Sequence, residues 1–395
     1  MTQLLSILFR RVPIGWLQLT HSRPRFVAAV AGIAFANLLV FLQLGVVASL
    51  SAVVNLTYSP FRADIMISPP SATLFTGALV ARRIMYMALA EPGVSDATPL
   101  YLGSREWKQP DGISKMLFVF GMAPEASAFA SEPIAAQMNR LSLPDRVLLD
   151  SQVRNLALNW DATAIDQASM EKPLTFEISG HTVAAVGSFK LGSGFGSDGA
   201  LFVSDQTFQR LVKERTTGTA SHILVDVKPG EDPAVIARRL EARLSPEHVQ
   251  VRTMAQAIAD DLVYTNTQVP MGIIFGIGVF VAILVGLVIV YQVLAADVAA
   301  HLKEYATFKA MGFPHRFLLG IVFEEAMIIA LIGFLPGVIL GAGVYQVMGA
   351  ATDLPLGMTA GRAAAVLLGT FVACSISGAL ATVRLRRADP AELFG

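Results

Sequence analysis

Residues 26–61 read FVAAVAGIAFANLLVFLQLGVVASLSAVVNLTYSPF and contain no Asp, Glu, Lys or Arg. Three further uncharged runs follow much later in the chain, at residues 269–296, 326–352 and 363–383. Each run is long enough to cross a hydrocarbon core of about 30 Å as a helix, which takes roughly 20 apolar residues. The sequence therefore predicts four transmembrane helices, one before and three after a polar insert at residues 62–268.

The distribution of Lys and Arg predicts the orientation of these helices. Basic residues precede the first run, follow the last and lie between the second and third: Arg10, Arg11, Arg23, Arg25, Arg384, Arg386, Arg387, Lys303, Lys309 and Arg316. The connection between the third and fourth runs has only Arg362. By the positive-inside rule, both termini (1–25 and 384–395) and the loop 297–325 are cytoplasmic, and the insert is outside.

The N-terminal run is too long for the apolar core of a signal peptide, and about 25 residues precede it, so we interpret it as an uncleaved anchor. Those residues suit a kinked helix in the headgroup layer with Trp16 as an interfacial anchor; a frayed basic tail is the alternative.

The insert reads as a mixed α/β domain. Strand-like runs and one helical segment occupy its beginning, and a strand, a helix capped by Asp232 with Pro233 at its first position, and a second strand occupy its end. We expect these two ends to pair in one sheet, and residues 123–219 to form an outer lobe. The single cysteine, Cys374, lies in the last apolar run, so no disulfide within this chain can hold the insert. The predicted fold class is an α+β membrane protein with a large mixed α/β periplasmic domain.

Motifs for catalysis or metal binding do not stand out. No lysine is followed by Ser or Thr, which excludes the phosphate-binding loop G-x-x-x-x-G-K-[ST]. The six histidines are scattered without ligand spacing, and no G-x-S-x-G occurs. Ser169 to Lys172 matches S-x-x-K but precedes Pro173, which favours an exposed turn, and the glycines from Gly192 to Gly199 favour a hairpin tip. We expect no catalytic residue, no cofactor and no metal in this chain.

Small residues recur every four positions in two of the apolar runs. They are Ala28, Gly32 and Ala36 in the first run, and Gly333, Gly337 and Gly341 in the third. Such faces let helices approach closely, either within one subunit or between two. Asn37 and Gln43 are the strongly polar side chains in the middle of the first run, and no run has an ionisable residue at its centre, which argues against a proton relay.

The cytoplasmic loop contains HLKEYATFKAMGFPHR at residues 301–316, a short amphipathic helix ended by Gly312 and Pro314. KEYA at 303–306, KAMG at 309–312, the Glu325–Ala326 pair and DPAE at 389–392 resemble the FtsX-like permeases of ABC transporters, a group that includes MacB, LolC and LolE. The nearest resemblance is to the DevC-type permeases of heterocyst glycolipid exporters, through segments such as FLQLG at 41–45 and GFLPG at 333–337.

This resemblance implies a bacterial inner-membrane homodimer that exports by mechanotransmission, with ATP hydrolysed on a separate ATPase subunit. The implied coupling residues are Lys303, Glu304, Tyr305, Phe308, Lys309, Met311 and Gly312. In tripartite members, a periplasmic adaptor and an outer-membrane channel complete the path; we expect the lipid bilayer but no nucleic acid as a further partner. The alternatives are an FtsX-like signalling permease that controls an extracytoplasmic partner, and a lipoprotein-releasing permease.

Overall fold

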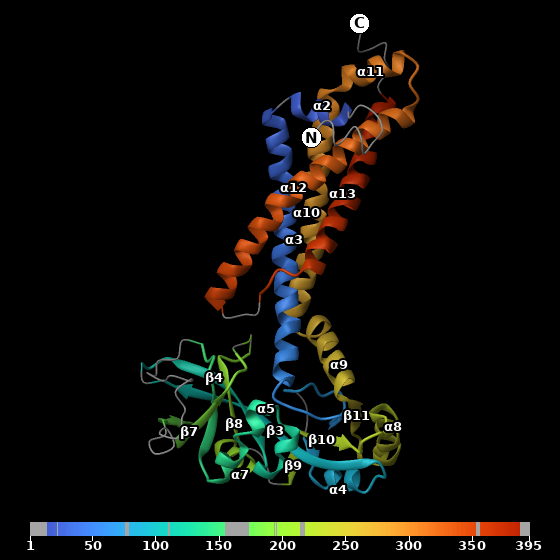
Figure 1. The fold of residues 1–395 in the computed structure, drawn as a ribbon. Helices are drawn as coiled ribbons and strands as arrows, with labels where there is room; N and C mark the ends of the chain where they lie inside the picture. The colour runs from blue at the N-terminus through green and yellow to red at the C-terminus, as the bar shows by residue number, and fades with distance from the viewer. Residues whose placement is uncertain are drawn as a thin grey trace. The chain divides into compact units, whose positions relative to one another are not determined.

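The computed structural model describes residues 14–21, 23–75, 79–109, 111–154, 174–192, 194, 196–213, 218–352 and 356–387. The chain divides into two compact units. The helical unit comprises Met1–Ser49, Pro270–Thr352 and Leu356–Gly395, and the insert unit comprises Leu50–Val269 with Asp353–Pro355. Figure 1 shows the elements of each unit.

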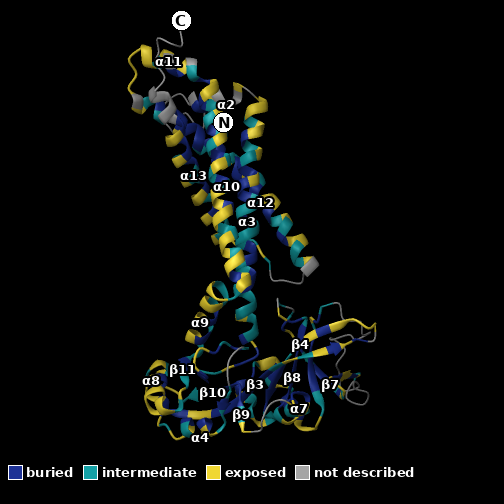
Figure 2. Ribbon diagram, turned by 180° about the vertical axis from the view of Figure 1, so that it is seen from behind, coloured by how far each residue is buried: buried dark blue, intermediate teal, exposed yellow. Residues whose placement is uncertain are grey.

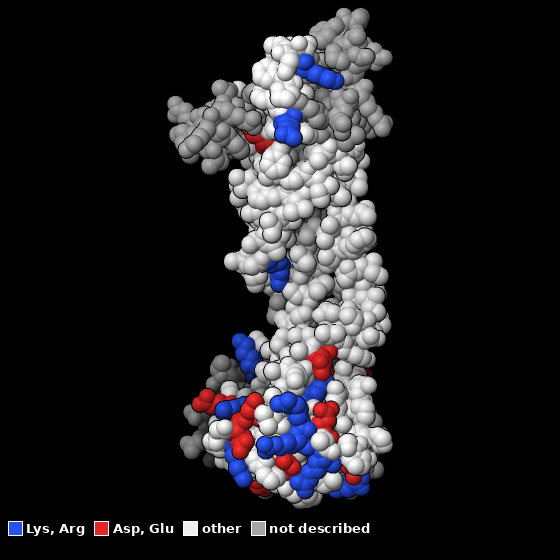
Figure 3. Space-filling model, turned by 90° about the vertical axis from the view of Figure 1, so that its right-hand side faces the viewer, with Lys and Arg blue, Asp and Glu red and all other residues white. Residues whose placement is uncertain are grey.

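The helical unit contains four helices that are long and apolar enough to cross a membrane, as the sequence predicted. They are α3 (Arg23–Tyr58), whose last turns belong to the insert unit, α10 (Pro270–Ala300), α12 (His315–Thr352) and α13 (Ala360–Arg387). Two short helices accompany them, α2 (Ile14–His21) and α11 (Leu302–Ala310). Because α10 and α12 extend beyond their uncharged runs, α11 and two short turns are all that separates them. On the face drawn in Figure 3, the helical unit shows few charged side chains.

The predicted small-residue faces pack within this chain. A Cβ atom added to Gly333, Gly337 or Gly341 of α12 would lie 2.8 to 3.2 Å from side chains of α3. A Cβ added to Gly32 of α3 would lie 3.3 Å from Ile289 of α10, and Ala36 is buried. Ala28 differs, since it is exposed on the outer face of α3. About half of the residues of α10 are exposed, and Gly286, Val290 and Leu294 are among those buried against its neighbours (Figure 2).

The insert unit is built on a nine-stranded mixed sheet in the order β11-β1-β10-β3-β4-β8-β5-β7-β6. The strands are β1 (Ile65–Ser68), β3 (Val94–Lys108), β4 (Ser114–Met122), β5 (Arg146–Asp150), β6 (Leu174–Ile178), β7 (His181–Phe189), β8 (Gly199–Ser204), β10 (His222–Val227) and β11 (Gln250–Thr253), with a separate pair, β2 (Val80–Ala81) and β9 (Thr219–Ala220). The two ends of the insert do meet in one sheet, through β1, β3, β10 and β11.

The long strand β3 joins the two halves of this sheet. Its first part pairs with β10 and its second part, from Tyr101 to Lys108, pairs with β4. The half of the sheet that corresponds to the expected outer lobe begins with β4, before the expected boundary at residue 123. Sequence reasoning missed β4 because the alternation of buried and exposed residues at 114–118 gives way to a continuous buried stretch.

Helices cover the sheet of the insert unit and complete its cores. They are α4 (Arg83–Leu89), α5 (Glu132–Ala135), α7 (Asp205–Leu211), α8 (Pro233–Leu244) and α9 (Met254–Thr267), with 3₁₀ turns at Pro124–Phe129, Met138–Ser142 and Ser245–Glu247. The predicted cap of α8 is present, because Asp232 accepts a hydrogen bond from the backbone N–H of Ala234 and Pro233 stands at the first position. Ile236 and Leu240 of this helix pack on β1 and β10.

Candidate functional sites

The first candidate is the coupling segment, which we define as α11 with the turn at residues 311–314. Glu304 lies in the first turn of α11 and Lys309 in the last, each at the end of the helix dipole that favours its charge. The helix ends in a Schellman motif: Phe313 N–H donates to Phe308 O at 3.1 Å, Gly312 N–H donates to Lys309 O at 3.1 Å, and Gly312 has a φ of +88°. The helix α11 therefore ends at a defined residue, with its C-terminal carbonyl groups hydrogen-bonded by the turn that follows.

Burial separates the predicted coupling residues into two groups. Glu304, Lys309, Met311 and Gly312 are exposed and Phe308 is half-buried, whereas the side chain of Lys303 lies outside the described set. Tyr305 is 0 % exposed and packs in the core formed by α3, α10, α12 and α13. Its predicted role as a side chain that fills a groove of an ATPase is therefore wrong in this structure, because its ring is already enclosed by its own chain.

Sequence reasoning missed Phe313 as a surface residue of the coupling segment. It is 41 % exposed, beside Met311 at 59 % exposed. Its ring stacks on Phe317 at 4.7 Å between centroids, and Phe308 meets both rings edge-on at 5.8 and 5.9 Å. The sequence did contain a signal for Phe313. It directly follows Gly312, which ends the helix, and a Schellman motif commonly has an apolar residue at that position.

Ionisable side chains are buried beneath the coupling segment. His301 Nδ1 lies 3.1 Å from Glu304 Oε1, and its Nε2 lies 4.0 Å from Asp297 Oδ1. Glu324 and Glu325 of α12 are also buried. Burial, followed by the charges of Glu325 and Asp297, raises the pKa of Tyr305 above its ordinary value of 10.0, so its hydroxyl stays protonated.

The helix α2 closes the same region from another direction. A Cβ added to Gly15 would lie 2.9 Å from Cγ of Glu325, so glycine permits the close approach of α2 to α12. Four helices, α2, α10, α11 and α12, thus converge around Glu325 and Tyr305. Buried polar groups and a packed core therefore connect the coupling segment to α10 and α12.

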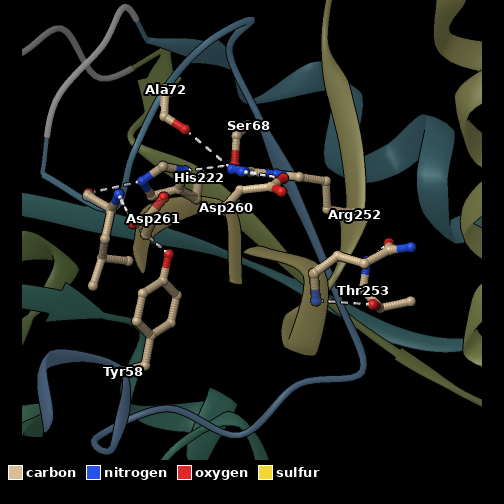
Figure 4. Close-up of polar contacts among 10 residues, drawn as sticks. Tyr58, Ser68, Ala72, His222, Arg252, Thr253, Asp260 and Asp261 are labelled. Carbon is tan, nitrogen blue, oxygen red and sulfur yellow. Dashed lines mark hydrogen bonds and ion pairs between the residues drawn. The ribbon is translucent and has the colours of Figure 1, made fainter. Parts of the chain in front are cut away.

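The second candidate is the Asp261 network in the insert unit, shown in Figure 4. Oδ2 of Asp261, on α9, accepts hydrogen bonds from the Tyr58 hydroxyl at 2.7 Å and from the backbone N–H of Leu74 at 2.8 Å. Tyr58 is the last residue of α3, and Leu74 lies in the loop after β1. One carboxylate therefore ties the end of α3 to the loop and to α9.

Two further side chains fasten that loop. His222 of β10 lies between Ser68 Oγ and Leu74 O, at 2.9 Å from each. Because the carbonyl can only accept, Nε2 carries a proton, and in the neutral ring Nδ1 then accepts from the Ser68 hydroxyl. Arg252 of β11 donates to Ala72 O at 3.0 Å and pairs with Asp260 at 3.1 Å.

Asp261 is buried, and its surroundings shift its pKa. Burial raises the pKa of Asp261, while the hydrogen bonds from Leu74 and Tyr58 and the charge of Arg252 act in the opposite direction. The helix α9 is also fixed at its first turn by a capping box between Thr253 and Gln256. Sequence reasoning did not predict this network, because Tyr58 and Asp261 are 203 positions apart and no local pattern links them.

Comparisons with known proteins identify the family. The MacB-like periplasmic core domain matches residues 26–243, more than half of the chain, and the FtsX-like permease C-terminal domain matches residues 276–390. The chain belongs to the MacB/FtsX-like family of ABC transporter permeases. It is thus a membrane permease component with a mixed α/β periplasmic-type domain inserted between its first and second apolar helices.

Solved structures and curated proteins complete the comparison. The chain is similar to the periplasmic region of MacB from Actinobacillus actinomycetemcomitans, at 10% identity and a TM-score of 0.33, over 53% of this chain and 96% of that one. It is also similar to the extracellular domain of the noncanonic ABC-type transporter YknZ from Gram-positive bacteria, at 12% identity and a TM-score of 0.32, over 48% and 98%. A domain of a permease protein from Porphyromonas gingivalis matches at 14% identity and a TM-score of 0.31, over 50% and 90%. No curated protein matches the chain.

Proposed function

We propose that this chain is the permease subunit of an ABC-type exporter that works by mechanotransmission, in the bacterial inner membrane with both termini cytoplasmic. ATP is hydrolysed on a separate ATPase subunit that docks on the exposed face of the coupling segment. The observation that carries the proposal is the construction of this segment: apolar Met311 and Phe313 are exposed in the turn that follows a helix whose Tyr305 is buried in the core. A movement of the docked ATPase subunit could therefore be transmitted through this segment to α10 and α12.

The insert unit supplies the other end of the proposed path. Asp261 of α9, the helix that precedes α10 in the chain, is bonded to the last residue of α3 and to the loop that holds Leu74. Asp260 of the same helix pairs with Arg252 of β11, and His222 of β10 lies within hydrogen-bond distance of Leu74 O. These contacts would transmit movements of the two helices to the sheet. The outer lobe, from β4 to β8, offers a surface for a periplasmic adaptor, which would lead to an outer-membrane channel in a tripartite system.

We propose that the assembly is a homodimer that uses a face of α3 other than the one that carries Gly32. Gly32 packs against α10 of its own chain. The exposed face of α3, formed by Val27, Ala28, Ala31 and Phe35, is the surface available to a second copy. Within the family, the segments FLQLG at 41–45 and GFLPG at 333–337 support a DevC-type permease.

The decisive experiment is capture of the ATPase by the tagged full-length chain in its native host. We expect the wild-type chain to capture a protein that carries the G-x-x-x-x-G-K-[ST] loop, and Met311→Ala with Phe313→Ala to reduce that capture at least tenfold, because exposed apolar anchors dominate such interfaces. Leu335→Ala, an exposed residue in the span of α12, is the matched control and should capture normally. Equal capture by the double variant would refute docking at this segment, and capture of no such ATPase by the wild-type chain would refute the function itself.

A further inference from the structure

A pocket of about 400 Å³ opens on the insert unit where β3, the turn between β6 and β7, and the end of α7 meet; we call it the β3 pocket. Its basic lining residues are Arg105, His181, Arg210 and Lys213. Glu106 is its one acidic lining residue, and Arg210 also pairs with Asp145, which does not line the pocket, at 3.0 Å. The wall of the β3 pocket therefore has an excess of positive charge.

Two walls of the β3 pocket are held in place by their own structure. The Arg105 side chain donates from Nε to Leu211 O at 2.7 Å and from Nη1 to Ser104 O at 3.0 Å, which fixes the position of its charge. On the other wall, Ser179 and Gly180 connect β6 to β7 and have φ values of +49° and +78°. Positive φ at both residues is typical of the tightest hairpin turns, so this wall is short and defined.

The edge of β3 that borders the pocket has unused backbone donors. Leu102 N–H donates to Ser221 Oγ at 2.9 Å, on the side of β3 that faces away from β4. Because backbone groups alternate in direction along a strand, the N–H groups of Ser104 and Glu106 point to that same side. Neither N–H group has a hydrogen-bond partner among the residues that the structure describes. Unpaired N–H donors beside basic side chains favour a ligand with negatively charged oxygens.

The remaining lining residues distinguish a free anion from one that a protein carries. Glu106 is exposed and repels a small free anion such as phosphate. The same carboxylate can pair with a basic residue of a partner whose acidic residue contacts Arg105 and Lys213. Met116, 42 % exposed, adds an apolar contact beside these charges. A protein segment with neighbouring acidic and basic residues therefore matches the pocket better than a free anion does.

We propose that the β3 pocket binds an extended segment of a partner protein through an acidic side chain. The carboxylate of that side chain pairs with Arg105 and Lys213 and accepts hydrogen bonds from the unpaired N–H groups of Ser104 and Glu106. A basic residue of the same segment pairs with the Glu106 side chain. This inference concerns binding by the insert unit and stands apart from the export mechanism proposed above.

The test compares two peptides, acetyl-TTETKTT-amide and acetyl-TTQTKTT-amide, which differ only in the acidic residue. Glu and Lys two positions apart lie on one face of an extended chain. Binding to the full-length protein in detergent is measured by surface plasmon resonance. We expect the Glu peptide to bind at least about fivefold more tightly, because its carboxylate meets fixed donors in a partly enclosed pocket. Lys213→Glu should remove this preference, and Lys213→Gln should reduce it.

Lys228→Glu is the matched control, because Lys228 is exposed on the insert unit but does not line the β3 pocket. It should keep the preference of the wild-type protein, and the Tm of each variant shows that it is folded. Equal affinity for the two peptides would overturn the proposal, as would an unchanged preference in Lys213→Glu. Equal losses in Lys213→Glu and Lys228→Glu would also overturn it, since the preference would then come from overall charge. Inorganic phosphate is the third probe, and phosphate that binds more tightly than the Glu peptide would show that the pocket holds a free anion instead.

Discussion

Asp261 shows how a single buried carboxylate organises the insert unit. Because burial raises its pKa, its ionised form is less favourable in the folded than in the unfolded chain. The stability that it contributes is therefore present below the unfolded pKa of about 4 and is lost as the pH rises through the folded pKa. The same oxygen accepts two hydrogen bonds, which an amide oxygen at that position can also accept.

We predict that Asp261→Asn removes this pH-dependent loss. Thermal unfolding of the full-length protein in detergent should give a wild-type Tm that falls between pH 4 and neutral pH, and an Asp261→Asn variant whose Tm falls less. Asp261→Leu, which leaves the Tyr58 hydroxyl and the Leu74 N–H unpaired, should cost about 1–3 kcal/mol for each unsatisfied group. Identical pH profiles for the wild type and Asp261→Asn would contradict the assignment.

Asp226 provides a second pH-dependent group at the residue scale. Burial and the neighbouring carboxylate of Asp64 raise its pKa to about 6, and Asp96 lies opposite it on β3. Because the folded pKa is raised, stability should fall as the pH increases from about 4 to above 6. Asp226→Asn should therefore stabilise the protein at pH 8 but not at pH 4, by about 1 kcal/mol after allowance for solvent screening. A Tm gain of equal size at both pH values would contradict the prediction, because it would show that the gain does not come from removing the charge of Asp226.

Tyr305 and Met311 should behave differently although both belong to the coupling segment. We predict that Tyr305→Ala lowers the free energy of unfolding by about 3–5 kcal/mol, because it empties the space of a fully enclosed ring. Met311→Ala should change stability by less than about 0.5 kcal/mol, since its side chain is exposed. The comparison is made by Tm in detergent, and a Tyr305→Ala protein as stable as the wild type would show that the ring is not enclosed in solution.

At the scale of elements, the helices of the helical unit are fitted to one another by small residues. A Cβ atom added to Gly337 would lie 2.9 Å from Cβ of Asn37 and 3.1 Å from the backbone oxygen of Ala34, whereas one added to Gly32 would meet only the side chains of Ile289 and Val293. Backbone cannot move aside as a side-chain tip can, so the two positions differ in what they tolerate. Without a hydrophobic drive between helices in lipid, this close fit supplies much of the packing energy.

We predict that Gly32→Leu costs about 1–3 kcal/mol of protomer stability and that Gly337→Leu costs more. Ala31→Leu, on the exposed face of α3, is the matched control and should leave the Tm unchanged while it perturbs the dimer fraction. Tm and crosslinked dimer are measured on the same preparations. A Gly32→Leu protein with an unchanged Tm but a reduced dimer fraction would return Gly32 to the interface between subunits.

At the scale of the whole molecule, the order of elements along the chain determines which parts of the protein lie on the same side of the membrane. The sheet of the insert unit comes from the chain between α3 and α10, and the coupling segment lies between α10 and α12. Because α10 is the one spanning helix between the insert and the coupling segment, these two parts lie on opposite sides of the bilayer.

This topology is itself a prediction. A reporter inserted at Gly112, in an exposed turn between β3 and β4, should be external, and one fused after Gly395 should be cytoplasmic, by the positive-inside rule. Paired reporters active in opposite compartments are the measurement, since each works on one side only. Detection of both on the same side would overturn the layout and the proposed function with it.

The sequence by itself determined the features that depend on local composition. Charge-free runs predicted the four spans, Asp232 and Pro233 predicted the start of α8, and Gly312 with Pro314 predicted the end of the coupling helix. These predictions succeeded because hydrophobic length, helix caps and turn residues act over a few neighbouring positions.

The tertiary structure alone decided which faces meet. In an apolar helix every face looks alike, so nothing in the sequence marked Gly32 as packed on its own chain. In the amphipathic helix α11, nothing local showed that Tyr305 would be enclosed while Met311 stays exposed. Thr370 donates a hydrogen bond to Asn37, 333 positions away, and the sheet order places β8 between β4 and β5. Such contacts depend on how distant segments fit together, because lipid is as apolar as the helices themselves and leaves close packing to choose their partners.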